Sequence, residues 1–131
     1  MKITFVIPYF YPAWQYGGEP RSSFELARSL VARGHSVRVL TTDSGGAKRL
    51  GHIGKNEKRN VEGIDVLYYS NLSNSLAYRH RFFWPPEFFR RVHEELLHTQ
   101  ILHVHELRST ISVSAYRSAA RAKVQIGRAH V

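Results

Sequence analysis

The stretch that decides the fold is MKITFVIPYFYPAWQYGGEPRSSFELARSLVARGHSVRVLTT, residues 1–42. Residues 2–7 form an apolar run that ends at Pro8, which is typical of a strand buried on both faces. Apolar residues then recur at helical spacing, at Phe24, Ala27, Leu30 and Val31. Gly34 follows them as the predicted C-terminal cap, and residues 36–42 predict a second strand. A strand, a loop, a helix and a strand in this order indicate a β-α-β unit with parallel strands.

The rest of the chain continues the alternation. Residues 64–69 and 101–105 predict strands, residues 86–98 and 109–121 predict helices, and residues 123–125 predict the start of a fifth strand. The polar residues 43–60 are predicted to be a loop. The fold class is therefore α/β, a Rossmann-like parallel sheet with flanking helices. Ligands of such sheets bind beyond the carboxyl ends of the strands.

Composition narrows the classes of function. The 131 residues contain no cysteine, so disulfides and thiolate metal sites are excluded. Lys and Arg number 19 against 10 Asp and Glu, and the net charge of +9 favours anionic partners, although it also fits an ordinary basic surface. No apolar run is long enough to span a membrane and no cleavage site follows the first strand, so we expect a cytoplasmic protein.

The last six residues, IGRAHV, fit no structural pattern. They match one reading frame of a common short-read sequencing adapter, so we expect residues 126–131 to be a non-native read-through tail outside the sheet. Residues 1–125 would then form a partial Rossmann-like domain of a truncated chain. The fourth strand would lack a neighbour at its outer edge, and the isolated chain would be marginally stable.

The adjacent glycines Gly17 and Gly18 precede the first helix. Glycine lets the backbone approach a ligand closely, and amides at a helix N-terminus bind phosphate. The spacing matches neither G-x-G-x-x-G nor a P-loop, so a plain turn is the alternative. Arg21, in the first helical turn, is unfavourable for the helix dipole unless it holds an anion, which favours the phosphate interpretation.

Residues 1–43 resemble the amino-terminal signature of glycosyltransferase family 4, in which a Gly-Gly loop leads to a helix that ends in L-x-x-R-G-H-x-V-x-V-x-T. The resemblance continues through RFFWPPEFFRRV and ILHVHELR and so covers nearly all of residues 1–125.

The resemblance implies one half of a GT-B enzyme, which has two Rossmann-like domains and an active site in the cleft between them. Such enzymes transfer a sugar from a nucleotide-sugar donor with retention and need neither a metal nor a cofactor. Their acceptors include glycans, lipid-linked sugars and other precursors of the cell envelope. Gly17 and Gly18 would lie against the donor diphosphate, and Glu19 and Arg21 would lie on the acceptor side. The donor-binding half and a histidine beyond the fifth strand are absent from this sequence, so we expect the chain alone to be inactive.

His103 and His105 in LHVHEL share one face of a strand and could both reach one metal ion. No third ligand with supporting spacing is evident, so no metal site is predicted. The alternatives are polar residues that simply end a strand and acceptor contacts by His105 and Glu106, to which we add Arg108.

YRHRFFWPPEFFRRV interleaves cations with aromatic residues. We expect Phe88, Phe89, Val92 and Leu96 to pack a helix on the sheet. Arg79, Arg81 and Trp84 are then expected to rim the acceptor cleft. Peripheral contact with the inner face of the membrane is a further expectation, whereas no nucleic-acid motif is recognisable. Two rival functions stay open: a non-catalytic Rossmann-like module that binds a phosphorylated small molecule or an anionic surface, and a metal-dependent hydrolase.

Overall fold

The structure, a computed structural model, describes residues 1–11, 18–45, 56–74, 83–105, 109–122 and 124–128. A six-stranded sheet forms the centre, in the order β3-β4-β2-β1-β5-β6. Its strands are β1 (Lys2–Val6), β2 (Ser36–Thr42), β3 (Glu57–Val61), β4 (Ile64–Tyr69), β5 (Ile101–Val104) and β6 (Gln125–Arg128). All neighbours are parallel except β3, which runs antiparallel to β4.

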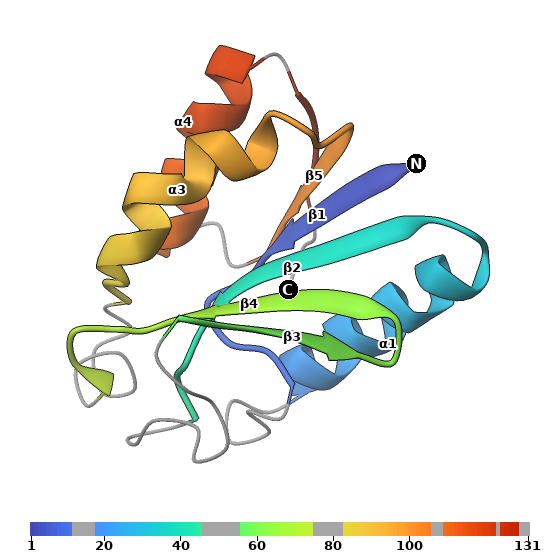
Figure 1. The fold of residues 1–131 in the computed structure, drawn as a ribbon, viewed down its shortest axis with the longest axis horizontal. Coiled ribbons are helices and arrows are strands. Elements are labelled where there is room, and N and C mark those ends of the chain that lie inside the picture. Colours follow the sequence, from blue (N-terminus) through green and yellow to red (C-terminus); the bar gives the residue numbers. More distant parts are fainter. Residues whose placement is uncertain (12–17, 46–55, 75–82, 106–108, 123, 129–131) are drawn as a thin grey trace.

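Helices cover both faces of the sheet (Figure 1). Helix α1 (Gly18–Ala32) lies on one face, and helices α3 (Pro86–Leu96) and α4 (Thr110–Ala122) lie together on the other. The predicted Rossmann-like α/β class is confirmed. The predicted strands at residues 2–7, 36–42, 64–69 and 101–105 are confirmed within one or two residues.

The core has two layers, one on each side of the sheet. On the α1 side Phe24 and Ala27 pack on Phe5 and Val39. On the other side Phe88, Val92 and Leu96 of α3 pack on the sheet with Ile111 of α4. These helical residues recur every three or four positions because that spacing places them on one face of a helix. Burial on both faces explains why the central strands are apolar throughout.

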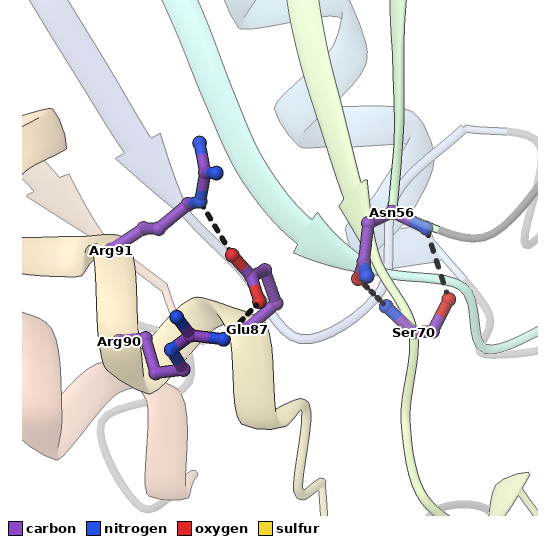
Figure 2. Close-up of polar contacts among 5 residues, drawn as sticks. All are labelled: Asn56, Ser70, Glu87, Arg90 and Arg91. Atoms are coloured by element: carbon purple, nitrogen blue, oxygen red, sulfur yellow. Dashed lines mark hydrogen bonds and ion pairs between the residues drawn. The ribbon is translucent and has the colours of Figure 1, made fainter.

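The ends of the helices follow local rules. Gly34 closes α1 at a φ of +92°, and its N–H donates to the carbonyl of Val31 at 3.0 Å, as predicted for a C-terminal cap. Pro86 opens α3, where its missing N–H costs nothing. Glu87 accepts from Arg91 at 2.5 Å and from Arg90 at 3.3 Å, within the first turns of α3 (Figure 2).

The predicted loop at residues 43–60 is wrong at its end, because residues 57–60 belong to β3. The strand carries almost no apolar residues and was therefore not recognisable by alternation. It forms because Glu62 and Gly63, at φ of 51° and 88°, make a tight hairpin turn into β4. At the other end of the hairpin, Asn56 and Ser70 exchange two hydrogen bonds, of 3.1 and 2.9 Å (Figure 2).

The expectation that the chain leaves the sheet at residue 126 is also wrong. Residues 125–128 form β6, which pairs with β5 from Ile101↔Gln125 to Val104↔Arg128. The outer edge of β5 is therefore covered, contrary to the predicted unpaired edge. Strand pairing is made by backbone groups, so any segment without proline can pair with the edge of β5. The side chains of residues 126–131 alone therefore could not exclude a strand.

Candidate functional site

The carboxyl ends of β1, β2, β4 and β5 point to one edge of the sheet (Figure 1). Helices α1 and α4 follow β1 and β5 in the chain, so both begin at this carboxyl edge. Their amino ends carry partial positive charge. The carboxyl edge is where a ligand of such a sheet binds.

A buried polar cluster lies beyond β2 and β4. Asp43 follows β2 and is only 1% exposed. Its Oδ1 accepts from the backbone N–H of Asn71 at 3.0 Å and from Nδ2 of Asn74 at 3.2 Å. Nδ2 of Asn71 in turn donates to Oδ1 of Asn74 at 2.9 Å. The carboxylate of Asp43 thus fixes the start of the segment that leaves β4.

The segment that leaves β1 is held in a similar way. The hydroxyl of Thr42 donates to the carbonyl of Pro8 at 2.6 Å, and the hydroxyl of Tyr68 donates to the carbonyl of Tyr11 at 2.6 Å. The ring of Tyr11 stacks on Phe24 of α1 at 4.8 Å between centroids. Strands β2 and β4 therefore fix the backbone on the way from β1 to the beginning of α1.

His105 directly follows β5, at the carboxyl edge of the sheet. Its N–H continues the sheet by donating to the carbonyl of Val6 at 2.9 Å, and its side chain is 5% exposed. The rings of His103 and Phe5 lie 4.6 and 5.2 Å from its own ring, so the two histidines share one face as predicted. Burial, and secondly the charge of His103, lower the pKa of His105 to about 4. The imidazole is therefore neutral at pH 7.

Helix α4 begins with a chain of hydroxyl groups that leads to His105. The hydroxyl of Ser109 accepts from the N–H of Ser112 at 3.1 Å, which caps the helix. It also donates to the hydroxyl of Ser112, which donates to the carbonyl of His105 at 2.8 Å. The next residue, Thr110, donates from its hydroxyl to the carbonyl of Phe83. The backbone around His105 is thus tied to the beginning of α4.

Most buried polar atoms in proteins have a hydrogen-bond partner, so the exceptions are informative. Within the described residues, four buried side-chain atoms have none: Oγ1 of Thr41, the hydroxyl of Tyr69, Oδ1 of Asn71 and Nε2 of His105. Thr41 lies among the last two positions of β2 and Tyr69 ends β4. Asn71 lies just beyond β4, and His105 lies just beyond β5. The residues that carry these unsatisfied atoms lie at the carboxyl ends of the strands, and the atoms themselves are buried.

The predicted site residues are only partly described. Gly18 is the first residue of α1, so this helix begins two residues before Pro20. Arg21 is exposed in the first turn, and the backbone of Glu19 is helical. Gly17, Glu106 and Arg108 lie outside the described residues, as do Arg79 and Arg81. Trp84 is 42% exposed and its carbonyl accepts from the N–H of Leu72 at 3.1 Å, which places it at the carboxyl edge.

Nothing in the described part of the chain gathers three side chains suited to hold a metal ion. The described helices also include none that is long and apolar enough to cross a membrane. The carboxyl edge holds hydroxyl, amide and neutral imidazole groups, a class of group that forms hydrogen bonds with hydroxyl groups.

Asp43, Asn71 and Asn74 were not singled out from the sequence. The available signal was their position, because the segments TTDSGG and YYSNLSNS directly follow two predicted strands. Asp43 is 28 and 31 positions away from its two partners, a separation that no local pattern covers.

No curated protein matches the chain significantly. The sequence does match glycosyltransferase family 4 over residues 16–130, which includes the helices α1, α3 and α4 and the carboxyl ends of β2, β4 and β5. On the strength of this match, and with the sheet that the resemblance predicted, the chain belongs to glycosyltransferase family 4.

Proposed function

We propose that this protein transfers a sugar, with retention of configuration, from a nucleotide-sugar donor to a glycan or a lipid-linked acceptor of the cell envelope. In this proposal the chain supplies the acceptor side of the active site. The loop at Gly17 and Gly18 lies against the donor diphosphate, and no metal or other cofactor takes part. Membership of glycosyltransferase family 4 supports a glycosyltransferase-type activity.

The observation that carries the acceptor side is the set of unsatisfied buried polar atoms at the carboxyl edge. A sugar acceptor presents several hydroxyl groups, each of which both donates and accepts hydrogen bonds. Nε2 of His105 and Oδ1 of Asn71 are the kind of partner that such hydroxyl groups need. Because an unpaired buried polar group costs about 1–3 kcal/mol, satisfying these groups on binding stabilises the complex.

We propose acceptor-binding roles for Glu19, Arg21, His105, Glu106 and Arg108, which sit in the chain at the amino end of α1 and in the connection from β5 to α4. His105 is a binding residue in this proposal and not a general base, since a pKa near 4 makes it a weak acceptor of protons at pH 7. The proposal also places the protein in the cytoplasm, in peripheral contact with the inner face of the membrane.

The experiment is a transfer assay with the full-length enzyme, in which this chain is joined to its donor-binding half, because we expect the chain alone to be inactive. It uses a panel of nucleotide sugars with glycan and lipid-linked acceptors. The anomeric configuration of the product, read by NMR, tests retention directly. An inverted product, or the absence of transfer from every donor with every acceptor, would refute the proposal.

Two variants test the phosphate loop. Gly18→Val places a branched side chain where the backbone approaches the diphosphate, and we expect donor affinity and transfer to fall about 10- to 100-fold. Arg21→Ala removes an exposed cation and no backbone contact, so its loss should be below about fivefold and should shrink with added salt. Full activity of Gly18→Val would show that the glycines only form a turn.

A further inference from the structure

A second surface, away from the buried atoms of the carboxyl edge, is hollowed between α3 and α4. The groove encloses about 540 Å³ and is lined by residues of both helices and by Trp84. Trp84 and Phe89 form one side near the beginning of α3, with ring centroids 4.6 Å apart. Val113, in the first turn of α4, faces the same groove and is exposed.

The charge of the groove has one sign. His93, Arg117 and Arg121 line it, and no acidic residue does. Within the part of the chain that the structure describes, none of the ion pairs involves Arg117 or Arg121. Glu87, in the first turn of α3, pairs with Arg90 and Arg91 (Figure 2) and does not line the groove.

The groove leads away from the carboxyl edge. Its aromatic end is joined to that edge, since Leu72 donates to the carbonyl of Trp84 and Thr110 donates to the carbonyl of Phe83. Its cationic end lies further along α4, because Arg117 and Arg121 follow Val113 by one and two helical turns. Val113 and Arg121 are therefore about 12 Å apart along the helix axis, which is longer than one sugar ring.

We propose that this groove binds an acidic glycan, a chain of sugars that carries carboxylate groups. Trp84, which is 42% exposed, packs against the C–H face of a sugar ring, and Arg117 and Arg121 pair with carboxylates further along the glycan. Ser114 and Ser118, which also line the groove, supply hydroxyl partners between these two ends. The inference rests on the proposed function: the glycan in the groove continues the acceptor whose end lies at the carboxyl edge.

An acidic glycan fits better than a lipid surface. Arg117 and Arg121 line the groove, at the end opposite Trp84 and Phe89. A membrane-binding helix instead presents its apolar residues outward and its cations beside the lipid head groups. A flat anionic surface would reach Trp84 but would leave the groove unfilled.

The test is a binding titration with a hexamer of galacturonic acid, a neutral hexamer of glucose and vesicles that contain phosphatidylglycerol. The variant Arg117→Gln/Arg121→Gln removes both cations. Its control, Arg33→Gln/Lys58→Gln, removes two exposed charges at the end of α1 and on β3, away from the groove. We expect the first variant to weaken binding of the acidic hexamer about three- to tenfold and the control to leave it unchanged. A further variant, Trp84→Ala, should weaken binding of both hexamers.

Equal binding of the acidic and neutral hexamers would overturn the proposal, and so would an equal loss in the control. Binding of the vesicles without binding of the acidic hexamer would assign the groove to a membrane instead. The titration needs neither a donor nor turnover. Transfer without hexamer binding therefore refutes the groove alone, and hexamer binding without transfer refutes the proposed function alone.

Discussion

Acidification should destabilise this protein through one histidine. His105 is 5% exposed and its pKa is about 4, whereas an exposed histidine has a pKa near 6.5. Between these two values the unfolded state binds a proton that the folded state does not. The contribution of His105 to stability is therefore fully present above about pH 6.5 and is lost progressively as the pH drops towards 4. Below pH 4 this group causes no further loss.

The size of the effect follows from the two pKa values. Between pH 7 and pH 5, His105 alone should lower the free energy of unfolding by about 2 kcal/mol. The ring neighbours of His105 among the described residues, Phe5 and His103, do not reverse the sign. Burial lowers the pKa of His103 as well, so this second histidine acts in the same direction.

The assay is urea unfolding at pH 7 and pH 5 for the wild-type protein and for His105→Phe. Phenylalanine keeps a ring against Phe5 and has no titrating group, so the difference between the two pH values should shrink by about 2 kcal/mol. At pH 7 the variant should be at least as stable, because an unpartnered buried nitrogen is removed. If His105→Phe retains the full pH dependence of the wild type, the burial of a neutral imidazole is not its cause.

Three further predictions concern stability. Gly63→Ala should cost about 2–3 kcal/mol in urea unfolding, since φ is 88° and the new Cβ would lie 2.9 Å from Cγ1 of Val31. Gly34→Ala, at φ of 92° with open space around it, should cost only about 1–2 kcal/mol. Equal costs of the two variants would contradict the contact with Val31. Phe88→Ala should cost about 3–5 kcal/mol of the free energy of unfolding because the ring is fully buried, and Phe89→Ala should cost clearly less because Phe89 is half-buried. If thermal unfolding shows that Phe89→Ala costs more than Phe88→Ala, the face of α3 that packs on the sheet is not the one described. Asp43→Ala should cost about 1–3 kcal/mol because it leaves two buried donors, on Asn71 and Asn74, without an acceptor. Asp43→Asn keeps an acceptor and should cost less. Similar midpoints of chemical denaturation for both variants would show that the charge of Asp43, and not its hydrogen bonding, stabilises the fold.

The sequence by itself determined the order of β1, β2, β4 and β5 and of the helices that connect or follow them. The apolar runs that became β1, β2, β4 and β5 are long enough to be recognised, and Phe88, Val92 and Leu96 mark one face of α3. These features are local, since the periods of strand and helix decide which side chains share a face. The sequence also predicted that polar residues after the strands would gather at one edge, because parallel strands end on the same side.

Only the tertiary structure decided β3, β6 and the contents of the carboxyl edge. The strand β3 is polar and depends on its pairing with β4, and β6 depends on its pairing with β5. Likewise, Asp43 meets Asn71 and Asn74 only because β2 and β4 are neighbours in the sheet. The low pKa of His105 also comes from packing against Phe5 and His103, and Phe5 is a hundred positions away. Hydrogen bonding and desolvation act through space, so a pattern along the chain shows which groups are available but not which of them meet.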